Sequence, residues 1–371
     1  MRAAATSALI ALIALPAVAQ AQSDAGARLD VYVDEDLVVV VPAASVHLEP
    51  KGSNIDIDVG WMANVLSGAT PLLTADVVTS ATRFDDVRNA IDVAVSGQPN
   101  PLTTVKGTAR VSLEEDYLVA ATSIGVQQEV GKRMAVLSAS YTALFEQAWT
   151  VHHDGTKQGS MTHRADIGST LLLSRSTRLA LTASGLLHAC GEVIGCHANP
   201  YRFVLVTSPD SVLAVRELHP SSRARVAAKV KLSQAIGRHV ALHGGYRFYI
   251  DSWQVQGHTG ELDVGLGFMD ERILLRLGGR MTRQTAASFY SRKYEASSGL
   301  VPGVRTGDRE LAGLWSWRVG GRLELAWLGV GRMLRVAVHT RLHHTWYRYP
   351  DYPWAPRRNA WVGGLGVDAE F

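Results

Sequence analysis

The chain has 371 residues, with 37 Lys and Arg against 34 Asp and Glu, and two cysteines. A formal net charge of +3 is too close to neutral to indicate a nucleic-acid-binding protein. Beyond the first 21 residues, no segment approaches the ~20 consecutive apolar residues that a membrane-spanning helix needs.

The N-terminal segment has the features of an export signal. Arg2 is charged, residues 8–15 are apolar, and Ala19-Gln20-Ala21 is a small-x-small cleavage motif. A secretory signal of this kind is removed and takes no part in the fold. We therefore expect a signal peptide over residues 1–21 and a single domain over residues 22–371.

Apolar and polar residues alternate along most of the remaining sequence. In residues 223–235, Ala224 and Val226 alternate with Arg223 and Arg225. A period of two residues is that of a β-strand, and one apolar and one charged face per strand is typical of a membrane barrel. The alternating runs cover residues 28–33, 37–48, 54–66, 87–96, 103–114, 117–130, 133–147, 163–174, 178–190, 223–235, 240–250, 258–268, 272–281, 310–328, 333–347 and 359–371.

The connections between these runs are of two kinds. Short turns include residues 131–132, 174–177 and 269–271, whereas residues 67–86, 191–220 and 286–308 form long loops. Bacterial barrels have an even number of strands, short periplasmic turns and long extracellular loops. The pattern predicts an all-β fold: a transmembrane antiparallel up-and-down β-barrel of about sixteen strands, with about fourteen as the alternative.

The last run ends on an aromatic residue. Trp361, Leu365, Val367 and Phe371 share one face of residues 359–371. This ending is similar to the C-terminal signature of bacterial outer-membrane proteins, which their assembly machinery recognises. We therefore expect outer-membrane lipid and the barrel assembly machinery as partners, no nucleic acid, and a location in the bacterial outer membrane.

Two cysteines lie close together, with His188 and His197 beside them. Cys190 and Cys196 are separated by five residues. In an oxidising compartment this spacing favours a disulfide that closes a surface loop. A metal site is the alternative, although the spacing is not typical of zinc.

Basic residues dominate the polar faces of the predicted strands. Rings of arginine in a pore favour anions, so a weakly anion-preferring channel is one hypothesis. The alternative is a plugged interior in which arginines pair with acids and loops. The basic residues predicted to line the interior are Arg110, Arg223, Arg225, Lys229, Arg247, Arg272, Arg276, Arg280, Arg322 and Arg335.

The sequence contains no recognisable catalytic motif. GxSxG is absent, and no nucleophile motif surrounds His258, Glu261, Asp251 and Ser252, which we place near one outer hairpin with His258 facing the interior. Adjacent residues of a strand face opposite sides, so His343 and His344 cannot share a metal ion. We expect no catalytic, cofactor-binding or metal site, and we rank a barrel hydrolase below the other functions.

Six segments carry a family resemblance across the mature chain. They are NVLSGAT (64–70), DVVTSATRFDDVR (76–88), SLEEDY (112–117), ELHPSSRAR (217–225), YRFYIDSW (246–253) with His258 and Glu261, and QTAASFY (284–290). Together they resemble the bacterial outer-membrane family catalogued as domain of unknown function 3570. The resemblance implies an outer-membrane barrel and assigns no substrate. We therefore consider two functions for this protein. The first is a channel or transport barrel with a basic, anion-preferring lumen. The alternative is a plugged structural or adhesive barrel that acts through its extracellular loops.

Overall fold

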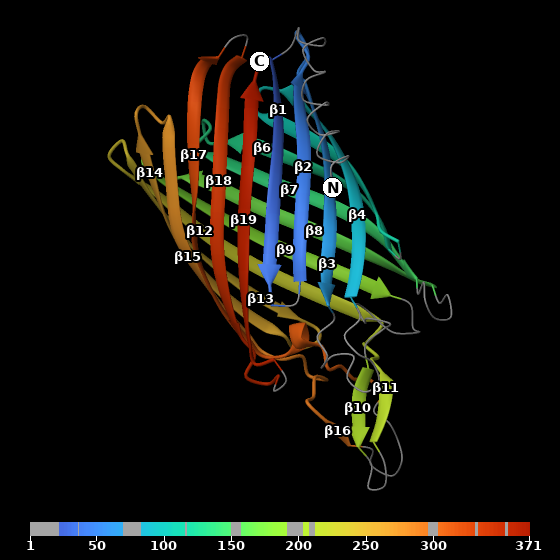
Figure 1. The fold of residues 1–371 in the computed structure, drawn as a ribbon. Helices are drawn as coiled ribbons and strands as arrows, with labels where there is room; N and C mark the ends of the chain where they lie inside the picture. Colours follow the sequence, from blue (N-terminus) through green and yellow to red (C-terminus); the bar gives the residue numbers. More distant parts are fainter. Residues whose placement is uncertain are drawn as a thin grey trace.

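The computed structural model describes residues 22–35, 37–69, 83–115, 117–149, 157–190, 203–207, 212–295, 303–330, 333–352 and 355–371. Sixteen strands of this part of the chain close into an antiparallel barrel (Figure 1). No helix among these residues is long and apolar enough to cross a membrane. The barrel strands are β1 (Gln22–Asp34), β2 (Leu37–Glu49), β3 (Ile55–Ala69), β4 (Arg83–Asn100), β5 (Thr103–Leu113), β6 (Tyr117–Val130), β7 (Ala135–Trp149), β8 (Lys157–Leu172), β9 (Thr177–Cys190), β12 (Ser222–Ile236), β13 (Val240–Asp251), β14 (Gln256–Phe268), β15 (Ile273–Gln284), β17 (Leu314–Val330), β18 (Met333–Arg348) and β19 (Arg357–Glu370).

The strand order is that of an up-and-down barrel. Each barrel strand pairs with the barrel strands before and after it in the chain, and β1 pairs with β19 to close the ring. The predicted fold class and the count of sixteen strands are therefore confirmed, and the alternative of fourteen is wrong. The short run predicted at residues 28–33 is the second half of the full-length strand β1.

The pairing register keeps large apolar side chains together on the outer face. Leu29 lies opposite Leu365, and Val59 lies opposite Val93. Leu365 is 57% exposed and Leu262 is 62% exposed, because no other part of the protein covers this face. The residues between them point inward, where polar groups predominate. A closed ring of this kind satisfies its backbone hydrogen bonds internally and leaves no strand edge.

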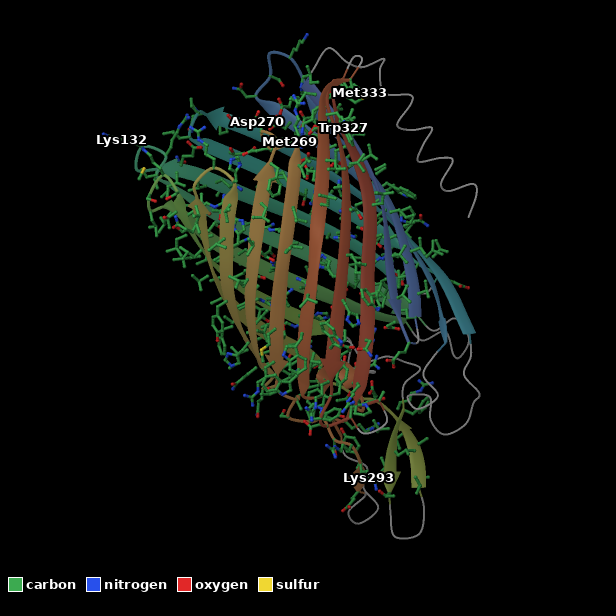
Figure 2. All side chains as sticks on the ribbon, turned by 60° about the vertical axis from the view of Figure 1, so that its left-hand side comes forward. Lys132, Met269, Asp270, Lys293, Trp327 and Met333 are labelled. Atoms are coloured by element: carbon green, nitrogen blue, oxygen red, sulfur yellow. The ribbon has the colours of Figure 1, made fainter. Side chains whose placement is uncertain are left out.

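Aromatic residues gather on the outer face. Near one end, the ring of His344 lies 4.2 Å from those of both Trp346 and Trp361, and Trp315 stacks on Trp317. Trp327 is half-exposed near the opposite end (Figure 2). Amphipathic rings at two levels of an apolar exterior are typical of the aromatic girdles that lie at lipid–water interfaces.

The two ends of the barrel differ. Lys132, Met269, Asp270 and Met333 lie together at the end with short connections, here called the turn end, whereas Lys293 lies beyond the opposite loop end (Figure 2). In the β6–β7 turn, Gly131, Lys132 and Arg133 all have positive φ, and so do residues 269–271 in the β14–β15 turn. The long connections lie at the loop end, as the sequence predicted.

The predicted long loops contain structure that the sequence analysis missed. Residues 191–220 include β10 (Phe203–Thr207) and β11 (Val212–Arg216), and residues 286–308 include β16 (Tyr294–Glu295). These strands form a separate sheet that projects beyond the loop end (Figure 1). The loop predicted at residues 67–86 is also too long, because β3 continues to Ala69 and β4 begins at Arg83. These runs are short or irregular in polarity, so alternation alone does not reveal them.

Ion pairs that skip a strand reinforce the closure of the barrel. Arg341 of β18 reaches across β19 to Asp30 of β1, with 2.8 Å between Nη2 and Oδ2. The pair passes over Gly364, where a Cβ atom would lie 2.1 Å from Asp30 Oδ1. Arg358 of β19 also pairs with Asp34 of β1. Gly364 thus provides the space for a contact that joins both sides of the seam.

We expect Gly364→Val to displace the Asp30–Arg341 pair and to lower the free energy of unfolding by about 1–3 kcal/mol, the usual cost of overpacking. Urea unfolding in detergent micelles, followed by tryptophan fluorescence, would measure the change. Gly107→Val is the matched control, because a Cβ atom at Gly107 meets no atom within 4 Å. Equal stability of the two variants would contradict a role for Gly364 in closure.

Candidate functional site

The inner wall of the barrel carries most of the predicted basic residues. The strand registers place nine of the ten at inward positions, and Arg272 lies in the turn before β15. The ten residues belong to strands or turns on several sides of the ring rather than to one patch. Whether each of these basic residues is neutralised therefore depends on the acidic residues near it.

Several of these cations are neutralised by nearby acids. Arg223 Nη2 lies 2.5 Å from Asp251 Oδ2, and Lys229 Nζ lies 2.6 Å from Glu261 Oε1. Arg335 contacts both Glu324 and Glu370, Arg322 contacts Glu324, and Arg110 lies 3.5 Å from Asp92. All these pairs join residues on one strand or on strands no more than two apart in the lateral order.

Positive charge remains in excess on the wall formed by β15, β17 and β18. Arg276 lies directly opposite Arg322, which lies opposite Arg341. Four residues further along β15, toward the loop end, Arg280 lies opposite Arg318 of β17. Like charges directly opposite on neighbouring strands are destabilising. Within the described residues, Arg276, Arg280 and Arg318 make no ion pair to offset this repulsion.

Four of these arginines, all except Arg280, line a depression in the wall, here called the arginine hollow. Gly278 and Gly320 lie opposite each other between the two arginine rows. The lack of side chains there leaves room for Asp263 over Gly278 and for His343 over Gly320. The cavity of about 230 Å³ is lined by Arg276, Arg318, Arg322, Arg341, His343, Glu261, Asp263 and the glycines of β15 and β17.

A larger cavity of about 580 Å³ lies on the inner wall toward the turn end. Its lining is mainly acidic, in contrast to the arginine hollow. Lys106 and His47 both contact Asp58 there, at 3.0 and 2.7 Å. The acids that line it are Asp24, Asp58, Asp92, Asp368 and Glu370.

At the loop end, a buried cluster ties the rim together. Asp251, at the end of β13, accepts hydrogen bonds from the backbone N–H groups of Trp253 and Val255 and from the Tyr249 hydroxyl. The Asp251 carboxylate also forms an ion pair with Arg223, whose guanidinium group lies 4.1 Å from the centre of the Trp253 ring. The carboxylate thus fixes the β13–β14 connection and an arginine of β12 at once.

The same cluster holds the two structured loops. Glu217 is fully buried and accepts hydrogen bonds from the Thr306 hydroxyl and the Gly307 N–H, both at 2.9 Å. His219 packs against Trp253 and Phe289. Tyr294 donates to the carbonyls of Phe289 and Thr306, and burial raises the pKa of its hydroxyl, so the phenol keeps the proton that it donates. The sequence segments 217–225, 246–253 and 284–290 therefore converge in space.

The structure does not assemble the residues considered for a barrel hydrolase. His258 was predicted to face the interior, but it lies on the outer face, where its ring packs on Phe248 and Tyr246. Tyr246 and His258 Nδ1 are 2.6 Å apart. The carboxylate of Asp251 is engaged by its hydrogen bonds and its ion pair with Arg223 at the loop end. The prediction was wrong because His258 and Leu262 are four residues apart and share the outer face of β14, whereas Glu261 faces the interior.

The histidine and cysteine predictions have different outcomes. His343 faces the interior and His344 packs on Trp361 outside, as adjacent strand residues should. Cys190 is disulfide-bonded, whereas Cys196 lies outside the described residues, so their pairing stays a prediction, as does the signal peptide. Among the described residues, ligand atoms of His47, Glu49 and Asp56 lie within 4.8 Å of one another. His47 is hydrogen-bonded to Asp58 and Glu49, and Asp56 accepts a hydrogen bond from Ser96.

The sequence profile of the family described as "Protein of unknown function (DUF3570)" matches residues 146–326. The family resemblance predicted from the sequence is confirmed. The match to DUF3570 extends from the end of β7 into β17 and includes the three segments that meet at the loop-end cluster. Among curated proteins, nothing matches the chain.

The chain is also similar to solved outer-membrane protein structures, at low sequence identity. A mutant of the ferric enterobactin receptor PfeA from Pseudomonas aeruginosa has a TM-score of 0.42 at 10% identity, over 88% of this chain and 54% of that one. The ferric-catecholate import receptor Fiu from E. coli has a TM-score of 0.45 at 8% identity, over 95% and 82%. Pseudomonas aeruginosa OccK2 (OpdF), in complex with glucuronate, has a TM-score of 0.47 at 7% identity, over 95% and 98%. The chain thus spans about half the length of PfeA.

We expect Glu217→Ala to loosen the loops at the loop end, because it leaves the buried Thr306 hydroxyl and the Gly307 N–H without their acceptor. The cost should be about 1–3 kcal/mol. Hydrogen exchange of residues 203–216 and 303–311 would measure it as faster exchange. Glu295→Ala removes an exposed carboxylate from the same sheet and serves as the control. Equal exchange in both variants would contradict the role given to Glu217.

Proposed function

We propose that the protein is a channel of the bacterial outer membrane whose lumen favours anions. The observation that carries the proposal is the lateral pattern of contacts in the wall. Among the described residues, each barrel strand packs on its neighbours in the ring, and the ion pairs of the wall join strands no more than two apart. A barrel whose opposite walls met across the interior would instead show contacts between strands far apart in the ring.

The exterior supports the location in a membrane. A closed barrel satisfies its backbone hydrogen bonds without water, as a spanning structure must. The outer face presents aliphatic residues between two levels of aromatic rings. Exposed apolar surface of this extent would be an aggregation hazard in water. In a lipid bilayer the same surface stabilises the protein.

The charge of the wall supports a preference for anions. Arg276 and Arg318 make no ion pair among the described residues, and the arginine hollow adds Arg322 and Arg341. Fixed positive charge on a low-dielectric wall raises the local concentration of anions. The acidic lining nearer the turn end opposes this effect, so we expect a moderate preference.

One observation favours a second function, binding through the loop end. The sheet of β10, β11 and β16 projects from the barrel, and Val212 and Leu213 are more than half exposed on it (Figure 1). Such residues suit an adhesive or partner-binding surface. A hydrolase has the least support, since His258 lies on the outer face.

Conductance in planar lipid bilayers tests the proposal. We expect the purified protein to form channels whose reversal potential in a KCl gradient lies toward that of chloride. Reversing two unpaired charges with Arg276→Glu and Arg318→Glu should lower the chloride-to-potassium permeability ratio by roughly several-fold, because the local potential changes sign. Lys293→Glu makes the same type of change outside the barrel and should leave the ratio unchanged (Figure 2).

Absence of conductance from protein whose circular dichroism shows an intact barrel would overturn the channel proposal. It would favour the alternative in which the loop end binds a partner.

A further inference from the structure

We propose that the arginine hollow is a binding site for a compact, multivalent, protonated oxyanion of the phosphate class. The site would deepen the proposed function, since it rests on an interior that water and solutes can enter. It does not require that the bound ion be carried across the membrane. The charged residues that line it are Arg276, Arg318, Arg322 and Arg341, with Glu261, Asp263 and His343 at its sides, and Arg280 lies next to it, opposite Arg318.

The strand registers give the hollow two rows of cations with a gap between them. Arg276, Arg322 and Arg341 follow one another across β15, β17 and β18. Arg280 of β15 and Arg318 of β17 form a second row nearer the loop end. Gly278 and Gly320 occupy the positions between the rows, where the side chains of Asp263 and His343 lie over them, so an ion in contact with the arginines would also lie beside Asp263 and His343.

The charges of the hollow are not balanced from within the protein. Arg341 pairs with Asp30, and Arg322 shares Glu324 with Arg335. For Arg276, Arg280 and Arg318, the described part of the chain offers no ion pair. Arg280 lies opposite Glu261, whereas Arg276 and Arg318 line the cavity. A bound anion would supply negative charge beside Arg276 and Arg318.

The guanidinium groups indicate the class of ligand. Arginine presents its N–H donors in a planar fork that matches the oxygens of phosphate and carboxylate. A cavity of about 230 Å³ suits a small ion rather than an extended chain. Several arginines around one small cavity favour an ion with more than one negative charge.

Asp263 narrows the ligand class further. Its carboxylate lies over Gly278 at the edge of the hollow and has no hydrogen-bond or ion-pair partner in the described residues. A carboxylate repels a fully deprotonated anion, but it can accept a hydrogen bond from an oxyanion that keeps a proton at neutral pH. Inorganic phosphate keeps such a proton at neutral pH, whereas sulfate does not and a phosphomonoester has mostly lost it.

Isothermal titration calorimetry with inorganic phosphate tests the site on the full protein in detergent. We expect saturable binding by the wild type and binding weakened about tenfold or more by Arg276→Gln, since one charge-assisted hydrogen bond is lost. Arg110→Gln is the matched control. It makes the same charge change on β5, which lies eight strands from β15 in the lateral order, and should leave binding within about twofold.

Sulfate in place of phosphate tests the role of Asp263. The wild type should bind sulfate more weakly than phosphate, and Asp263→Asn should reduce that difference. Thermal unfolding by circular dichroism checks that each variant is folded. Removing Arg276 relieves repulsion between like charges, so we expect this variant to fold.

Three results would overturn the site: no saturable phosphate binding, equal weakening by Arg276→Gln and Arg110→Gln, or equal affinity of the wild type for phosphate and sulfate. Equal weakening would mean that phosphate responds only to the overall positive charge. The conductance measurement separates this inference from the channel proposal. Phosphate binding without conductance would support the site and refute the channel, and conductance without phosphate binding would do the reverse.

Discussion

Closure of the sheet by the pairing of β1 with β19 is the constraint on which the rest of the structure depends. An open sheet of this length would leave two edges of unpaired backbone groups, which lipid cannot satisfy. Once the ring is closed, no strand can slip by one residue without reversing both of its faces. The register therefore determines at the same time which residues meet lipid and which arginines meet the interior.

Glycine on the inner face links this constraint to the chemistry of the wall. Over Gly364 the Arg341–Asp30 pair crosses a whole strand, and over Gly245 the Lys229–Glu261 pair does the same. At Gly278 and Gly320 the same lack of a side chain leaves room for Asp263 and His343 beside the arginine hollow. Neighbouring parts of one wall thus use glycine to strengthen the barrel in one place and to form a charged cavity in another.

The alternation of residues was sufficient to predict the fold, because a period of two is imposed on every strand by contact with two different surroundings. It predicted sixteen strands, the two ends and the inward phase of Arg276 and Arg280. It could not reveal β10, β11 and β16, which are short strands held by Glu217 and Tyr294 rather than by a two-sided pattern. The arginine hollow also could not be predicted from the sequence. Arg276, Arg322 and Arg341 are distant in sequence, and the register that aligns them depends on the pairing of β15, β17 and β18.

The central claim is that the arginine wall faces an open, water-filled lumen. Ser316 lies on the inner face of β17, two residues from Arg318, and Ser316→Cys would place a thiol there. The account predicts that this thiol reacts in the folded barrel with methanethiosulfonate reagents, and about tenfold faster with an anionic sulfonate than with a cationic ammonium reagent of similar size. A thiol that fails to react in the folded barrel, or that reacts faster with the cation, would contradict the account.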